Sequence, residues 1–274
     1  MPATITPAKI RPAAVAGRFY PGEAGPLRAA VAQYLCEAKR APETESPRGR
    51  LKAIIAPHAG YAYSGPIAGS AFAALRELSG QITRVVLVGP SHFVPFTGLA
   101  VSSADAFATP LGLVPVDRAA VEQARTLPFV HEIDQAHGRE HGLEVHLPFL
   151  QETLGDFSVV PLVLGDCTGE QVAQFIELLW GGPETLISIS SDLSHYHDYA
   201  TAQGMDALTA WAIESLSPND IGHDQACGRR AIQGMLLTAR KHRLHVKTLD
   251  LRNSGDTAGS RDQVVGYGAW AFRE

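Results

Sequence analysis

Short apolar runs alternate with longer amphipathic segments along most of this chain. Four runs predict strands: Leu51–Ala56, Arg84–Gly89, Ser158–Leu164 and Thr185–Ser190. Continuous apolar runs rich in β-branched residues are typical of strands covered on both faces. Two more strands are expected over His245–Leu251 and Val264–Phe272, and these two could pair antiparallel.

Helical patterns fill the intervals between these strands. They lie at Gly25–Lys39, Pro66–Leu78, Asp117–Thr126, Glu144–Leu154, Gly169–Trp180, Tyr199–Leu216 and Gln225–His242. Strands that alternate with helices predict a three-layer α/β/α sandwich with a mixed, largely parallel central sheet. We expect one domain over residues 1–274, with Ala41–Arg50 as an exposed, polar loop.

The composition narrows the class of protein. The chain is 45% hydrophobic, which supports a sizeable core, and 23 basic against 28 acidic residues give a net charge of −5. Without a basic excess, general binding to nucleic acid or to an anionic membrane is not expected. Three widely spaced cysteines, no signal-peptide pattern and no membrane-length apolar run predict a cytoplasmic protein without a disulfide framework.

Histidines follow three of the predicted strands. His58 comes after the first strand, His92 after the second, and His195 after the strand ending at Ser190. Pro57 and Pro90 stand just before two of these turns, where proline ends a strand ladder. Because ligands bind outside the carboxyl ends of strands in open α/β sheets, the three histidines predict one site. Nearby, Tyr61 and Tyr63 are expected to line its cleft.

A second group of histidines lies at His137, His141 and His146. His141 and Glu144 would share a face if a helix begins here, whereas His146 would point the opposite way. The order H-x-x-E-x-H lacks the i, i+4 histidine pair of HExxH zinc enzymes, so that class is disfavoured. We expect His137 and His146 to be surface or core residues outside the site.

Cys227 precedes Arg229 and Arg230 at the start of a predicted helix. A helix N-terminus and adjacent arginines favour the thiolate, which binds metals or attacks carbonyls. Cys36 and Cys167 lack such surroundings and are expected to be inert packing residues.

Two kinds of chemistry fit these residues. Two histidines and a cysteine suit copper, iron or zinc, with His195 as an acid or base oriented by Asp192. A Cys227–His195–Asp192 nucleophilic triad fits as well. Residue spacing does not separate the two. Motifs for a P-loop, a dinucleotide fold or a hydrolase nucleophile elbow are absent from the sequence.

Seven co-linear motifs resemble the Memo-like family, whose bacterial and archaeal members are called AmmeMemoRadiSam system protein B. They are RPAAVAGRFYPG (11–22), APHAGYAYSGPIAGSAF (56–72), GPSHF (89–93), TPLG (109–112), EHGLEVHLPFL (140–150), SDLSH (191–195) and ACGRRAI (226–232). The resemblance implies the fold of class III extradiol dioxygenases, which open catechol rings with non-haem Fe(II).

The same resemblance implies roles for individual residues. The metal ligands of the family fall on His58, His92 and Cys227. The acid–base positions fall on His195, Asp192 and His141. Extradiol enzymes complete their iron site with a carboxylate rather than a cysteine, so catechol cleavage does not carry over directly.

These points predict a non-haem iron(II)- or copper-dependent oxidoreductase, with zinc as the less favoured metal. Its pathway would include an AMMECR-type protein and a radical SAM enzyme, as the family name implies. One alternative is a non-catalytic adaptor that binds a peptide or protein in the same cleft. Another is a metal-independent, cysteine-dependent hydrolase or transferase.

Overall fold

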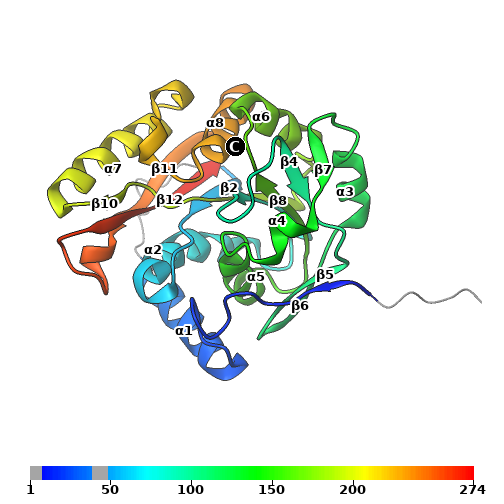
Figure 1. The fold of residues 1–274 in the computed structure, drawn as a ribbon, viewed down its shortest axis with the longest axis horizontal. Coiled ribbons are helices and arrows are strands. Elements are labelled where there is room, and N and C mark those ends of the chain that lie inside the picture. The colour runs from blue at the N-terminus through cyan, green and yellow to red at the C-terminus, as the bar shows by residue number, and fades with distance from the viewer. Residues whose placement is uncertain (1–7, 39–48) are drawn as a thin grey trace, which may run out of the picture.

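The computed structural model describes residues 8–38 and 49–274 (Figure 1). Most of the predicted loop at 41–50 lies outside the described residues. Most of the described residues form a sheet of nine strands with helices on both faces, as the sequence predicts.

Four parallel strands form the centre of the sheet, in the order β2 (Leu51–Ala56), β9 (Thr185–Ser190), β3 (Arg84–Pro90) and β8 (Ser158–Leu164). Nearly every residue in them is buried, in keeping with their continuous apolar sequences. All four strands begin and end within one residue of their predicted bounds.

Antiparallel strands extend this parallel centre. β12 (Val264–Arg273) pairs antiparallel with β2, and β11 (His245–Asn253) and β10 (His195–His197) pair antiparallel with β12. The expected antiparallel pairing of the last two strands is therefore confirmed. Beyond β8 lie β4 (Leu99–Val101), which is antiparallel to it, and β7 (Val130–Glu132).

A second, small sheet was not predicted. It contains β1 (Ile10–Arg11), β5 (Ala106–Thr109) and β6 (Gly112–Pro115). Strands of two to four residues are too short for an alternating pattern to stand out in the sequence.

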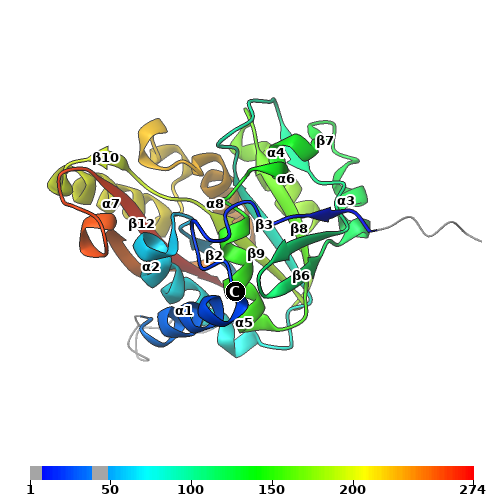
Figure 2. The ribbon, with the colours of Figure 1, turned by 60° about the horizontal axis from the view of Figure 1, so that its bottom comes forward.

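Helices form the two outer layers (Figures 1 and 2). On one face, α1 (Ala24–Cys36) packs on α2 (Tyr61–Ala73) and α5 (Leu147–Leu154). On the other face, α6 (Gly169–Leu178) packs on α8 (Arg229–His242), beside α7 (Tyr199–Glu214). Shorter helices are α3 (Arg118–Ala124), α4 (Asp134–Gly138) and 3-10 turns at Ala74–Leu78, Glu144–His146, Pro218–Asp220, His223–Gln225 and Ser254–Asp256.

The start of α2 differs from the prediction. The helix begins at Tyr61 rather than at Pro66, so Pro66 lies inside it. Gly65 and Gly69 face α1, where an added Cβ would come within 2.6 Å of the Tyr34 ring and 2.4 Å of its carbonyl oxygen, respectively. The small residues of α2 thus serve close helix packing, which offsets the poor helix propensity of glycine and proline.

Among the described residues, no helix is both long and apolar enough to cross a membrane.

Candidate metal centre

The sheet order brings the expected histidine turns together. β9 lies between β2 and β3, and all three strands run in the same direction. The turns that carry His58, Asp192 and His92 therefore leave neighbouring strands at one edge of the sheet. This edge is the place where α/β proteins bind their ligands.

His58, His92 and His141 form a cluster at this edge. A ligand-capable nitrogen of each residue lies within 4.8 Å of the others. The ring centroids of His92 and His141 are 4.4 Å apart, and that of His58 lies 5.0 and 5.5 Å from them. His141, which the sequence analysis places among acid–base residues, thus sits beside both predicted histidine ligands.

His58 is buried, with 1% of its surface exposed. Its Nδ1 lies 2.8 Å from Ser190 Oγ, and its main-chain N–H donates to Asp192 Oδ1 at 2.7 Å. Burial, together with the neighbouring histidines, holds the pKa of His58 well below its usual range. The ring is therefore neutral at pH 7, as a metal ligand must be.

Glu140 holds His92 in place. Its Oε1 lies 2.7 Å from His92 Nδ1, and its Oε2 accepts the main-chain N–H of His92 at 2.7 Å. Burial by itself would raise the pKa of Glu140, but the hydrogen bonds from His92 and Gly142 outweigh burial and lower it. A carboxylate behind a histidine is a recurrent support for metal ligands. Sequence reasoning missed Glu140, although it directly precedes His141 in the EHGLEVH motif.

His141 lies in the turn before α5. Its Nδ1 is buried and has no hydrogen bond among the described residues; Glu140 Oε1 is 3.6 Å away. Burial, and then the nearby His92, lower the pKa of His141 to about 4. The rings of Phe19 and Phe93 flank it, at centroid distances of 4.8 and 5.9 Å.

Cys227 contacts one member of the cluster, His58. Its Sγ lies 3.3 Å from Nε2 of His58. The expectation of a lowered cysteine pKa is wrong for the protein alone: burial, and then the charge of Asp192, raise the pKa of Cys227 to about 12. The desolvation of the sulfur outweighs the hydrogen bonds from Asp192, Ser191 and Gly228, which by themselves would lower the pKa.

Asp192 and His195 are close to the cluster, but they do not form the expected hydrogen-bonded pair. Nδ1 of His195 bonds to the carbonyl oxygen of Leu193 at 2.7 Å, while Asp192 accepts the main-chain N–H of His58. A main-chain carbonyl therefore orients the His195 ring. Burial raises the pKa of Asp192 to about 6, near neutrality.

The two expected cleft tyrosines differ. Tyr61 is buried and donates its hydroxyl to the carbonyl of Val145, so it is not on the cleft wall. Tyr63 is 44% exposed. The expectation for Tyr61 is wrong because this residue begins α2 and points into the core.

The other residues of the second histidine group lie outside the cluster. His137 bonds the carbonyl of Ala100, and His146 contacts Ser188 and Pro57, both as buried core residues. Glu144 does not share a helical face with His141, because α5 begins only at Leu147. Its carboxylate is instead buried against Arg11.

The donors fit a soft or borderline transition metal. Nδ1 of His58 and of His92 is occupied by a protein group, which leaves Nε2 of each ring to coordinate. Imidazole nitrogens and a cysteine sulfur are the ligands that copper, iron and zinc prefer.

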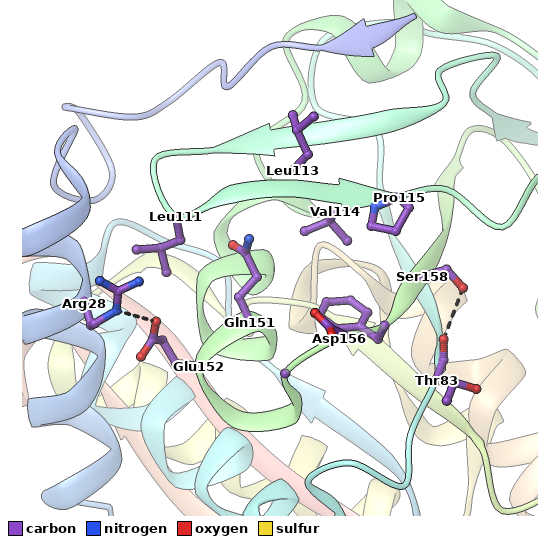
Figure 3. Close-up of a pocket in the computed structure, with 12 residues that line it drawn as sticks. Arg28, Thr83, Leu111, Leu113, Val114, Pro115, Gln151, Glu152, Asp156 and Ser158 are labelled. Carbon is purple, nitrogen blue, oxygen red and sulfur yellow. Dashed lines mark hydrogen bonds and ion pairs between the residues drawn. The ribbon is translucent and has the colours of Figure 1, made fainter. Parts of the chain in front are cut away.

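A separate hollow of about 630 Å³ lies between the β5–β6 hairpin and the end of α5 (Figure 3). Its lining includes Leu111, Leu113 and Gln151, with the Arg28–Glu152 ion pair at one side. Thr83 and Ser158 mark the amino ends of β3 and β8, so this hollow is at the opposite edge of the sheet from the histidines. None of its lining residues is a histidine or cysteine.

Fold and site together define an α/β protein with a histidine cluster at the carboxyl edge of a mixed sheet. The model of the Memo-like protein family matches residues 11–271. The chain belongs to this family, as its sequence motifs suggest.

Relatives described as MEMO1 family proteins match over nearly their full lengths. The protein of Nitrosopumilus maritimus is 30% identical over 96% of this chain and 99% of its own. Those of Thermotoga maritima and Metallosphaera sedula are each 32% identical, over 94% and 97% of this chain and 97% and 100% of their own. Among solved structures, an uncharacterized protein from Escherichia coli K12 matches 80% of this chain and 99% of its own, with 13% identity and a TM-score of 0.47.

Proposed function

We propose that this protein is a metal-dependent oxidoreductase that binds one iron(II) or copper ion through His58, His92 and Cys227. The observation that carries the proposal is the histidine cluster. Ligand-capable nitrogens of His58, His92 and His141 lie within 4.8 Å of one another. Cys227 Sγ lies 3.3 Å from His58 Nε2. The resemblance of their sequence motifs to the Memo-like family supports the same residues.

The donor set favours a redox metal. A thiolate is a soft ligand that stabilises copper or tunes iron, and imidazole nitrogens suit either metal. The bound ion would supply redox or Lewis-acid chemistry. A cation beside Cys227 would also favour loss of the thiol proton, against the burial that raises the pKa.

Three residues around the cluster are suited to move protons. His141, with a pKa of about 4, is neutral at pH 7 and is a weak base there. Asp192, with a pKa of about 6, can take up or release one near neutrality. His195 uses Nδ1 on Leu193, which leaves Nε2 for a substrate. General acid–base catalysis of this kind contributes about 10²–10⁴-fold in rate.

The adaptor alternative draws support from aromatic exposure next to the cluster. Phe93 is 45% exposed, and its ring lies 5.9 Å from that of His141. A binding module should keep its partner affinity in a His92→Ala variant, whereas an oxidoreductase should lose its activity. The hydrolase alternative is weakened by the raised pKa of Cys227. A cysteine hydrolase would keep its activity under chelators and lose it on alkylation of Cys227.

We propose that the protein acts in the reducing cytoplasm, since the metal site needs Cys227 as a free thiol. An AMMECR-type protein and a radical SAM enzyme are its proposed pathway partners, from family resemblance alone.

The test is the metal content of untagged protein purified without oxygen, measured by mass spectrometry. We expect near-stoichiometric iron or copper in the wild type, loss of the metal in Cys227→Ala and His92→Ala, and retention in Cys36→Ala, whose cysteine is exposed on α1. Stoichiometric zinc would redirect the proposal from redox chemistry to hydrolysis. Wild-type protein that stays metal-free after reconstitution would overturn it and favour the adaptor.

A further inference from the structure

The main-chain groups of Gly142 connect to the supports of both predicted histidine ligands. Its N–H donates to Glu140 Oε1 at 2.8 Å, and its carbonyl oxygen accepts the hydroxyl of Ser190. Glu140 in turn contacts Nδ1 of His92, and Ser190 contacts Nδ1 of His58.

The hydrogen-bond count at Ser190 determines the tautomer of His58. A serine hydroxyl has one hydrogen, and Ser190 donates it to the carbonyl of Gly142. Toward His58 Nδ1, 2.8 Å away, Ser190 can then only accept. The proton of the neutral His58 ring is therefore on Nδ1, and Nε2 carries the lone pair that faces Cys227.

Glu140 acts in the same way on His92. Its carboxylate faces three N–H groups: the main-chain N–H of His92, the main-chain N–H of Gly142 and the ring of His92. An ionised carboxylate only accepts hydrogen bonds, so in the neutral ring of His92 it places the proton on Nδ1. Nε2 of His92 is left with its lone pair.

The position of Gly142 leaves little room for a side chain. An added Cβ would lie 3.2 Å from Glu140 Oε1, 3.6 Å from His58 Nδ1 and 3.6 Å from His92 Cε1. The main-chain N–H and carbonyl of this one residue thus reach both supports, and a Cβ here would press on the Glu140 carboxylate.

We propose that Glu140 and Ser190 are positioning residues that fix His92 and His58 as Nδ1–H tautomers, with the main-chain N–H and carbonyl of Gly142 linking the two. Both Nε2 lone pairs are thereby set before a metal ion arrives. The tautomers are a property of the protein alone; only their consequence for metal affinity rests on the proposed function.

The tautomers are measured by long-range ¹H–¹⁵N NMR on ¹⁵N-histidine-labelled protein, stripped with a chelator, at pH 7.5. We expect both rings as Nδ1–H forms in the wild type. Ser190→Ala should let His58 populate the Nε2–H form as well. Glu140→Met keeps the side-chain size without an acceptor and should do the same for His92. Glu140→Gln retains one acceptor oxygen, so much of the His92 population should remain in the Nδ1–H form.

Ser188→Ala is the matched control. It removes a buried hydroxyl from the same strand, but that hydroxyl contacts His146 rather than His58. This substitution should leave the NMR signals of His58 and His92 unchanged. An Nε2–H form of either ring in the wild type, or unchanged tautomers in Ser190→Ala and Glu140→Met, would overturn the proposal.

Cobalt(II) titration of the same proteins measures the consequence. We expect Ser190→Ala and Glu140→Met to bind Co²⁺ about 10–100-fold more weakly than wild type and Ser188→Ala to bind it normally. If the tautomers behave as expected and the wild type binds no cobalt, the positioning roles stand while the proposed metal function fails. Normal cobalt affinity in both support variants would contradict a role in positioning ligands.

Discussion

Nε2 of His58 lies 3.3 Å from Sγ of Cys227, although 169 residues separate them in the chain. Asp192, in the turn after β9, holds Cys227 in this position. The main-chain N–H of Cys227 donates to the carbonyl of Asp192, and the main-chain N–H of Asp192 donates to Cys227 Sγ at 3.3 Å. Asp192 also accepts the main-chain N–H of His58. Asp192 thus holds both partners.

Cys227 should resist alkylation in protein stripped of metal. With a pKa of about 12, about one thiol in ten thousand is ionised at pH 8, and only the thiolate reacts quickly. Cys36 is exposed, so the expectation that it is an inert packing residue is wrong, and we expect iodoacetamide to modify it at least about tenfold faster. Peptide mass spectrometry over time measures both rates. Equal rates would mean that the helix start and the arginines stabilise the thiolate after all.

Acid should destabilise the fold through His137, which burial holds at a pKa of about 4 against an ordinary 6.5. The unfolded chain takes up the proton first, so this contribution to stability is complete above pH 6.5 and is lost as the pH falls to about 4. The loss amounts to about 3 kcal/mol.

Urea unfolding at pH 7 and pH 4.5 measures this effect. His137→Gln, which does not titrate, should be less stable than wild type at pH 7 but should lose less stability on acidification. The same acid-induced loss in both proteins would exclude His137 as its source.

Gly69→Ala should destabilise the protein by about 3 kcal/mol. The added Cβ would lie 2.4 Å from the carbonyl oxygen of Tyr34, a main-chain atom that can move only if α1 separates from α2. Gly204→Ala on α7 is the matched control, because a Cβ there meets nothing within 4 Å. It should raise the free energy of unfolding by about 0.5–1 kcal/mol, since alanine favours helix. Denaturant unfolding gives both values, and a tolerated Gly69→Ala would show that the two helices can separate freely.

Glu144→Ala should cost about 3–5 kcal/mol, because it leaves the buried Arg11 without its partner. The same carboxylate accepts the main-chain N–H groups of Ala14 and Val15, so the amino-terminal segment should loosen as well. The comparison is Glu152→Ala, whose ion pair with Arg28 is on the surface and should be worth less than about 1 kcal/mol. Thermal and urea unfolding measure the losses, and hydrogen exchange at residues 11–20 reports the loosening. A loss at Glu144 no greater than at Glu152 would contradict the argument.

The sequence by itself determined the four central strands and the alternation that makes this an α/β protein, because buried parallel strands are continuous apolar runs. It also placed His58 and His92 at the carboxyl ends of their strands, since proline and glycine end a strand locally. Those signals are contained within a few neighbouring residues.

Only the tertiary structure decided which side chains meet. It put His141 rather than His195 in the cluster with His58 and His92. The carbonyl of Leu193 orients the His195 ring, and Glu140 contacts the ring of His92. The tertiary structure also raised the pKa of Cys227, where local charge predicts a lower one. Hydrogen-bond partners and burial depend on segments far apart in the chain, so no local pattern encodes them.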